Sequence, residues 1–253
     1  MNAPAPIVQA LSLVEVSKVF GGLRAVSRVS LDVAVGERRV MIGPNGAGKT
    51  SLFHCISGAH QATEGRILCF GQDITRLAEH QRTLCGIGRT FQISSVFVDL
   101  TVMENVALAF LGVQPRKWNC WNPFRSVPGL VSRAEEKIRL VGLAGRESLL
   151  VRSLSYGERR QLELALALAN EPRLLLLDEP CAGLSPAERT KLSGLIKDLP
   201  RSITMLMIEH DMDIALALAD RVTVLNRGEV MLEGTADEVR TNPQVREVYF
   251  GEV

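Results

Sequence analysis

The sequence predicts an α/β fold: a mostly parallel sheet flanked by helices, a small antiparallel sheet at the N-terminal side, and a helical subdomain. Short apolar runs alternate with longer helical patterns, which is typical of parallel strands joined by helices. Residues 11–20 and 26–37 alternate apolar and polar side chains, as antiparallel strands with one buried face do. Between about Thr101 and Asn170 helical patterns replace the strand patterns.

Three apolar runs predict the buried strands of the parallel sheet. They are RRVMIG at 38–43, RLLLLDE at 173–179 and SITMLMIEH at 202–210. Open parallel sheets bind ligands at the carboxyl ends of their strands. The residues that close these runs are therefore the first candidates for a functional site.

The helical region is interrupted by GVQPRKWNCWNPFRSVPGL at 112–130, which we interpret as an irregular insertion. Its aromatic side chains, Trp118, Trp121 and Phe124, would form a small apolar cluster of the insertion itself or a surface for a partner. The tail NPQVREVYFGEV is expected to be a short helix or an ordered extension.

The whole chain, residues 1–253, is predicted to form a single domain. Residues 1–92 and 171–253 would form the core together with the antiparallel region, and residues from about 93 to 170 the helical subdomain.

Composition excludes some classes of protein. Twenty-nine basic residues against 28 acidic ones give a net charge of +1, so the chain lacks the basic footprint of a nucleic-acid binder. The five cysteines are irregularly spaced and include no C-x-x-C pair, which favours reduced thiols. No apolar run approaches the roughly 20 residues that span a bilayer, and MNAPAPIVQA does not resemble a signal peptide. We expect a soluble cytosolic chain that can dock on a membrane protein.

A phosphate-binding motif lies between a predicted strand and a predicted helix. GPNGAGKT at 43–50 matches G-x-x-x-x-G-K-[ST] in full, which predicts the P-loop NTPase (RecA-like) fold. Its glycines let consecutive N–H groups point at an anion, and the following helix adds its positive end. Lys49 is expected to reach the β- and γ-phosphates of ATP, and Thr50 to ligate Mg²⁺. The expected ATP-binding residues are Gly43, Pro44, Asn45, Gly46, Ala47, Gly48, Lys49, Thr50 and Ser51.

Two acidic residues follow the strand LLLLDE. Asp178 ends a buried strand and is expected to hold Mg²⁺ through water. Glu179 points elsewhere, so it can orient and deprotonate the attacking water. Acidic residues after a strand often only cap the next helix, but the P-loop upstream favours the catalytic interpretation.

Two further polar residues close predicted strands. His210 can donate a hydrogen bond to a γ-phosphate oxygen, although a lone histidine is more often structural. Asp211 beside it could be the N-cap of the helix MDIALALAD. Gln92 precedes the helical region, where its amide could ligate Mg²⁺ or the catalytic water and respond to the triphosphate.

Taken together, these residues resemble the ATP-binding subunit of an ABC transporter over nearly the whole chain. The resemblance implies that Phe20 is the aromatic platform for adenine, that Gln92 belongs to the Q-loop and that His210 is the switch histidine. LSYGE at 154–158 resembles the signature motif, and LLLLDE the Walker B motif.

The resemblance implies a site completed by a second subunit. Two subunits pair head to tail, and Ser155, Gly157 and Glu158 of one face the γ-phosphate held by the other. A helix N-terminus favours negative charge by about 0.3–1 kcal/mol at exposed sites, and Ser155 and Glu158 have the spacing of a capping box. Gly157 is expected to keep this approach free of a side chain.

The same resemblance implies partners and a location. The ATPase pair is a homodimer or a heterodimer with a second ABC ATPase, and two transmembrane permease subunits bind it. The surface at about 93–110 of this chain would receive a coupling helix of a permease. A periplasmic or extracellular binding protein acts indirectly, and no nucleic acid takes part. The location implied is the cytoplasmic face of the bacterial inner membrane.

Finer features resemble the ATPases of branched-chain (hydrophobic) amino acid importers. They are FGGLRAVSRVSLDV, the tyrosine of LSYGE, CAGLSPAE, MIEHDMD, the tryptophan-containing insertion and the tail VREVYFGEV. The chain resembles the ATPases of urea or short-amide importers, and those of lipopolysaccharide export, almost as closely. Both functions therefore stay as alternatives. Soluble ABC ATPases acting on DNA or ribosomes usually carry a long coiled coil or two cassettes, and this chain has neither.

Two positions depart from the family's usual pattern. Tyr156 replaces the commoner second glycine of the signature, and Ser185 stands where the loop after Walker B usually carries aspartate. The loss of that carboxylate predicts a weaker or different contact between this loop and the partner's P-loop.

Overall fold

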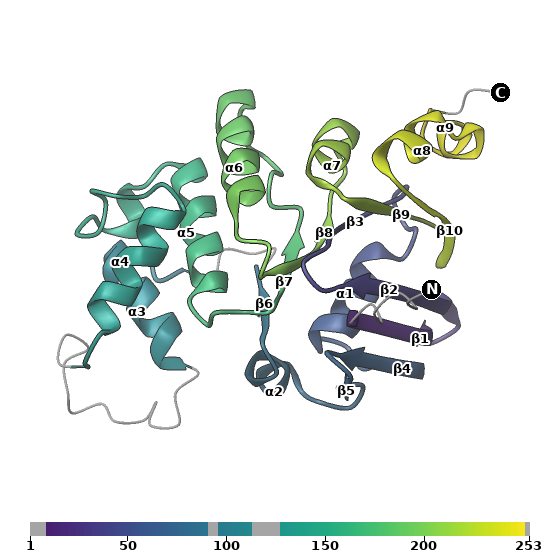
Figure 1. The fold of residues 1–253 in the computed structure, drawn as a ribbon, viewed down its shortest axis with the longest axis horizontal. Helices are drawn as coiled ribbons and strands as arrows, with labels where there is room; N and C mark the ends of the chain where they lie inside the picture. Colours follow the sequence, from purple (N-terminus) through teal and green to yellow (C-terminus); the bar gives the residue numbers. More distant parts are fainter. Residues whose placement is uncertain (1–8, 91–95, 113–126, 251–253) are drawn as a thin grey trace, which may run out of the picture.

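The computed structural model describes residues 9–90, 96–112 and 127–250. The described strands form two sheets (Figure 1), one ordered β2-β1-β4-β5 and the other β10-β9-β3-β8-β7-β6. The strands are β1 (Gln9–Phe20), β2 (Leu23–Ala34), β3 (Arg38–Ile42), β4 (Glu64–Cys69), β5 (Gln72–Asp73), β6 (Ile87–Arg89), β7 (Leu174–Asp178), β8 (Thr204–Ile208), β9 (Arg221–Asn226) and β10 (Glu229–Gly234). The helices are α1 (Lys49–Ser57), α2 (Glu79–Leu84), α3 (Val102–Gly112), α4 (Leu130–Leu140), α5 (Tyr156–Leu168), α6 (Pro186–Asp198), α7 (Met212–Leu218), α8 (Ala236–Thr241) and α9 (Pro243–Phe250).

The larger sheet is parallel from β6 to β9, and β10 pairs antiparallel with β9. Strand β3 pairs with β8 on one side and β9 on the other, with Val40 opposite Met207 and Val222. Because the central strands are parallel, β3, β7 and β8 end at the same edge of the sheet. The predicted α/β architecture with a mostly parallel sheet is confirmed.

The central strands are buried on both faces, which explains their uninterrupted apolar sequences. In β7, Leu175 and Leu177 belong to one apolar core, whereas Leu174 and Leu176 belong to the core on the opposite face. A fully buried leucine stabilises the fold by roughly 1.5–3 kcal/mol relative to an exposed one. A polar side chain in such a strand would therefore be costly on either face.

Each face of the larger sheet has its own cover (Figure 1). Helix α1 packs between this sheet and the antiparallel sheet, where Leu52 and Phe53 share a core with Leu11 of β1 and Val29 of β2. Helices α6 and α7 lie over the other face. The predicted antiparallel sheet at the N-terminal side is thus confirmed as the layer that encloses α1.

Helices α3, α4 and α5 lie beyond the β6 edge of the sheet (Figure 1). Phe110 of α3, Ile138 of α4 and Leu162 of α5 are buried in one core with the adjoining face of the sheet. The predicted aromatic cluster of Trp118, Trp121 and Phe124 lies outside the described residues. The proposed division of the chain at residues 92 and 170 stays a prediction.

The C-terminal tail forms α8 and α9, next to β9 and β10. The Tyr249 side chain is partly buried, and burial raises the pKa of its hydroxyl. The cysteines for which the structure gives a state, Cys55, Cys69, Cys85 and Cys181, are free thiols. In the described part of the chain, no helix is both long and apolar enough to cross a membrane.

Candidate nucleotide-binding site

The loop 43–50 joins the end of β3 to the start of α1, and backbone packing requires its glycines. A Cβ atom on Gly43 would lie 2.2 Å from the Leu225 carbonyl oxygen, and one on Gly48 would lie 2.3 Å from that of Ala25. Gly48 also has a φ of +98°, in the left-handed region that favours glycine. A Cβ atom on Gly46 would meet no heavy atom within 4 Å, so the tip of the loop is open to a ligand.

The buried Lys49 side chain folds back over this loop. Its Nζ donates hydrogen bonds to the carbonyl oxygens of Gly43 (2.7 Å) and Pro44 (3.0 Å). Burial lowers the pKa of Lys49, while the Glu179 carboxylate acts in the opposite direction. The first hydrogen bond of α1 runs from Leu52 N to Gly48 O (2.9 Å), so the N–H groups of residues 49–51 have no acceptor within the helix. An ammonium and free amides thus converge where the motif would hold phosphates.

Asp178 ends β7 as a buried carboxylate without a partner. The residue is 1% exposed, and neither Oδ1 nor Oδ2 has a hydrogen-bond partner among the residues that the structure describes. Burial raises the pKa of Asp178, and the Arg89 guanidinium lowers it. An unpaired buried charge is costly, and a hard divalent cation with oxygen ligands relieves that cost. The orphaned carboxylate and the Thr50 hydroxyl therefore fit the expected Mg²⁺.

Glu179 and His210 form a direct pair at the same sheet edge. Glu179 follows β7 with a φ of +47°, and His210 follows β8. The Oε1 atom of Glu179 lies 2.7 Å from Nε2 of His210. Positive φ is uncommon for a residue other than glycine and is found at functional sites. Asp211 caps α7 by accepting hydrogen bonds from Asp213 N and Ile214 N, which confirms the predicted capping role.

P-loop residues 45–51, Glu179 and His210 line one cavity of about 570 Å³, whereas Asp178 lies buried outside its lining. Sequence reasoning missed four of its lining residues: Leu23, Arg24 and Ala25 in β2, and Arg227 in the turn after β9. Arg227 has a φ of +49°, and its Asn-Arg-Gly turn was the one signal in the sequence. The full lining is Leu23, Arg24, Ala25, Asn45, Gly46, Ala47, Gly48, Lys49, Thr50, Ser51, Glu179, His210 and Arg227.

Besides Gly43, Pro44, Asp178 and the signature residues, two more predicted residues are not part of this lining. Phe20 ends β1, where its ring packs edge-on against His60 with the centroids 5.4 Å apart. Its role as an adenine platform stays a prediction. Gln92 lies outside the described residues, so its predicted ligation of Mg²⁺ is a proposal as well.

The turn at the start of α5 is held by the predicted capping box. Ser155 Oγ accepts a hydrogen bond from Glu158 N (3.1 Å), and Ser155 N donates to Glu158 Oε2 (2.9 Å). A Cβ atom on Gly157 would lie 2.5 Å from Oε1 of Glu188 in α6. The packing reason for glycine at 157 is thus the neighbouring carboxylate, which the sequence did not indicate. Residues 155–158 are absent from the lining of the P-loop cavity. Their action on another subunit's nucleotide stays a prediction.

A P-loop cavity on the core and a capped turn on a separate helix define an ATP-binding cassette. The chain belongs to the ABC transporter family, whose family model matches residues 26–182. A second model, described as branched-chain amino acid ATP-binding cassette transporter, matches residues 229–253. The chain is therefore an ABC transporter ATPase.

Relatives and solved structures agree with this assignment. The chain is 37% identical over 242 residues to the high-affinity branched-chain amino acid transport ATP-binding protein LivG of Escherichia coli (strain K12), covering 92% of this chain and 94% of LivG. It is similar to the ADP conformation of MJ1267, an ATP-binding cassette of an ABC transporter, with a TM-score of 0.87, 31% identity and coverage of 96% and 99%. It is also similar to a dimeric post-hydrolysis state of the cassette MJ0796 bound to ADP and Pi, with a TM-score of 0.75, 25% identity and coverage of 89% and 98%.

Proposed function

We propose that this chain is the ATP-hydrolysing subunit that powers the uptake of branched-chain amino acids through separate membrane subunits. The observation that carries the catalytic half is the orphaned Asp178 carboxylate at the sheet edge where Lys49, Glu179 and His210 converge. The likeness to LivG and the match of the C-terminal segment to the branched-chain amino acid model support the transported class.

In this proposal each residue at the sheet edge has one task. The P-loop amides and Lys49 bind the phosphates, and Lys49 exchanges its bonds to the Gly43 and Pro44 carbonyls for bonds to phosphate oxygens. Glu179 takes a proton from the attacking water, and His210 orients the Glu179 carboxylate through the 2.7 Å contact. Thr50, Asp178 and Gln92 would hold Mg²⁺. When bound, Mg²⁺ neutralises charge that develops on the phosphate oxygens.

A second ATPase subunit completes the site. Ser155, Gly157 and Glu158 would face the γ-phosphate on the partner's P-loop, because in this chain they lie away from its own P-loop cavity. Closed subunits then bind ATP more tightly than open ones, and hydrolysis returns the pair to the open state. The partner is a second copy of this chain or another ABC ATPase.

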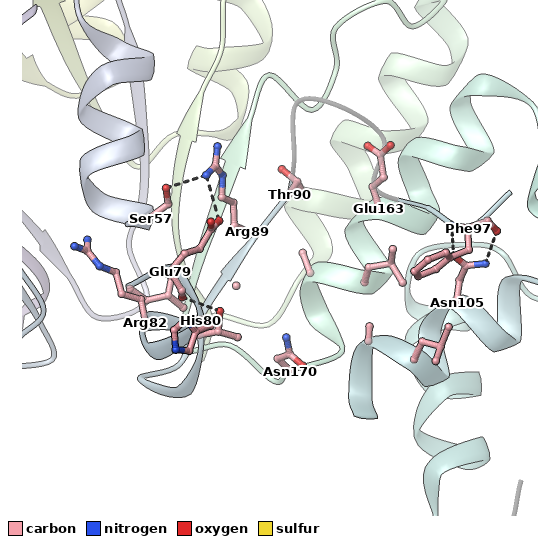
Figure 2. A pocket seen from close by; sticks show the side chains of 17 residues that line it. Ser57, Glu79, His80, Arg82, Arg89, Thr90, Phe97, Asn105, Glu163 and Asn170 are labelled. Carbon is pink, nitrogen blue, oxygen red and sulfur yellow. Dashed lines mark hydrogen bonds and ion pairs between the residues drawn. The ribbon is translucent and has the colours of Figure 1, made fainter. Parts of the chain in front are cut away.

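The permease subunits are proposed to dock in a groove between the core and α3 and α5 (Figure 2). The groove has a volume of about 580 Å³. Its α3 side carries exposed apolar side chains, Phe97 and Leu108, within the predicted surface 93–110. Its other side carries Arg89, which donates to Ser57 Oγ (2.9 Å) and pairs with Glu79 (3.5 Å).

Thr90 connects this groove to the nucleotide site. It lines the groove, and its hydroxyl accepts a hydrogen bond from Asp178 N (3.3 Å). A permease segment in the groove would therefore contact Thr90, whose hydroxyl is hydrogen-bonded to the backbone of Asp178, the proposed magnesium ligand. Docking of this kind places the chain on the cytoplasmic face of the membrane, with a substrate-binding protein acting from the other side.

Uptake in cells that lack the chromosomal copy of this chain tests the proposal. Wild-type protein should restore accumulation of radiolabelled leucine, isoleucine and valine, and Lys49→Ala protein, expressed equally, should not. The tagged wild-type chain should co-purify with a permease pair. Restored uptake of urea or short amides with no effect on leucine, or a defect in lipopolysaccharide export, would replace the branched-chain assignment by that alternative.

A further inference from the structure

The side chain of Tyr156, which departs from the usual signature, contacts the loop Cys181–Ser185 that follows the Walker B strand. Its hydroxyl donates to the Ala182 carbonyl oxygen (3.3 Å). A Cβ atom on Gly183, where φ is +74°, would lie 3.3 Å from the tyrosine ring, so the ring packs on this glycine. A glycine at 156 would make neither contact.

The same hydroxyl is joined to Arg160, one turn further along α5. Arg160 Nη2 donates to the Tyr156 hydroxyl (2.9 Å), and its guanidinium carbon lies 5.3 Å from the centre of the tyrosine ring. Arg160 Nη1 pairs with Glu163 Oε2 at 2.8 Å, and the two side chains are only 11% and 7% exposed. Hydrogen bonds from a charged donor are stronger than neutral ones, and the Arg160–Glu163 pair is further strengthened by its burial.

Glu163, the last residue in this series of contacts, lines the proposed permease groove. It lies on the α5 side of the groove in Figure 2 and is more than nine-tenths buried. Its second oxygen, Oε1, is buried and has no hydrogen-bond partner within the described part of the chain. A buried carboxylate oxygen without a donor is unfavourable, so a rotation of the Glu163 side chain that brings Oε1 to a donor on a docked segment would be favoured.

Glu188 ties the loop and α5 together from the opposite side. Its Oε2 accepts from Ser185 Oγ (2.7 Å) and Ser185 N (3.1 Å), and its Oε1 lies where a Cβ atom on Gly157 would approach to 2.5 Å. Hydrogen bonds from Ser185 and then from the Gly157 amide lower the pKa of Glu188. The loop Cys181–Ser185 and the first turn of α5 are thus fixed to one another at two points.

We propose that Tyr156, Arg160 and Glu163 form a relay that couples the loop Cys181–Ser185 to the permease groove. A hydrogen-bond donor of the docked permease segment binds Glu163 Oε1 and weakens the ion pair between Glu163 and Arg160. Arg160 then shifts, and the Tyr156 hydroxyl to which it donates shifts with it. The loop and the signature turn, which this chain presents to the second subunit, then move together. The three residues are positioning residues. The inference rests on the proposed permease partner. It adds which atom of this chain the permease contacts and which side chains connect that contact to the loop.

Two conservative substitutions test the relay in the complex with the permease. Tyr156→Phe removes only the hydroxyl, and Glu163→Gln replaces the carboxylate by an amide of the same shape. The measured quantity is the ratio of ATP hydrolysis with permease to hydrolysis without it. Each variant should lower this ratio by roughly threefold to tenfold, the value of one hydrogen bond. The double variant should lose no more than the stronger single variant, because both break one route.

Thr190→Val is the matched control, since it removes a hydroxyl of α6 that bonds only the Pro186 carbonyl and should leave the ratio unchanged. Amide hydrogen exchange of the chain without permease is a second readout. Tyr156→Phe should speed exchange at Ala182 and Leu184, and Thr190→Val should not.

Losses that multiply in the double variant, or unchanged exchange at Ala182 and Leu184 in Tyr156→Phe, would overturn the relay while leaving the proposed function intact. A wild-type chain whose hydrolysis ignores the permease would overturn both.

Discussion

The Nε2 atom of His210 lies 2.7 Å from Oε1 of Glu179, although 31 positions separate the two residues. Parallel pairing of β7 with β8 produces this contact, because Asp178 lies opposite Ile208 and both strands end at the same edge. The histidine therefore fixes the orientation of the carboxylate that we propose as general base. A carboxylate held in this way is ready to accept a proton from water before ATP arrives.

The first prediction concerns that carboxylate. Glu179→Gln should slow ATP hydrolysis by roughly 100-fold or more, because general-base catalysis contributes about that much. ATP binding should persist, so size-exclusion chromatography with MgATP should show a stable closed dimer. Glu136→Gln, an exposed change in α4, should behave like the wild type. Normal hydrolysis by Glu179→Gln would remove the base assignment.

The second prediction concerns the orphaned carboxylate of Asp178. Its pKa is raised in the folded state, so ionised Asp178 costs stability at neutral pH, and Asp178→Asn removes that cost. Without metal, the variant should be more stable than the wild type at pH 7, by about 1 kcal/mol or roughly 2–4 °C in melting midpoint. The gain should shrink as the pH falls through the raised folded-state pKa and vanish well below the ordinary aspartate pKa of 3.8, where the wild-type group is protonated in both states. Urea unfolding in EDTA at the two pH values measures the difference, and an equal gain at both would contradict this reading.

The same variant has a second expected consequence. Asp178→Asn should lose Mg²⁺-dependent hydrolysis despite its higher stability, because an amide oxygen is a weaker magnesium ligand than a carboxylate. A rise in stability together with a loss of activity separates a functional residue from a structural one.

The third prediction concerns Lys49. MgATP at about 100 times its Kd stabilises a protein by about 2.7 kcal/mol, so the wild type should melt about 5–10 °C higher with nucleotide. Lys49→Ala should lose most of this shift, since the buried ammonium lies against the loop that we propose to hold the phosphates. Arg66→Ala, an exposed change in β4, is the control. A full nucleotide shift in Lys49→Ala would show that the phosphates bind elsewhere.

Local patterns were enough to predict the fold and most of the sheet-edge site. Apolar runs such as LLLLD have no polar face and so mark strands buried on both sides, and Leu174 to Leu177 do alternate between two cores. The P-loop requires glycine because its own backbone packs against neighbouring backbone, a constraint that any such loop shares. Capping boxes such as Ser155 with Glu158 span three residues, so sequence spacing alone reveals them.

Contacts between distant segments were not predictable in this way. Nothing near Gly157 in the sequence indicates that Glu188 fills the space beside it, or that the Tyr156 hydroxyl reaches Ala182. The entry of Arg24 and Arg227 into the cavity depends on how the antiparallel sheet and the β9–β10 turn pack around α1. Such contacts follow from tertiary packing, which one sequence does not encode as a local pattern.

The central claim is that the reaction centre needs two subunits, with Ser155 of one chain acting on ATP held by the other. Hydrolysis by Ser155→Arg and Glu179→Gln chains, measured separately and then mixed with the permease pair, tests it most directly. Each variant alone should be nearly inactive, whereas a mixed dimer joins the intact Glu179 of one chain to the intact Ser155 of the other. If identical chains pair at random, the mixture should recover up to roughly a quarter of the wild-type rate. The claim would be contradicted if the Ser155→Arg chain alone hydrolysed ATP at the wild-type rate and mixing it with the Glu179→Gln chain brought no increase.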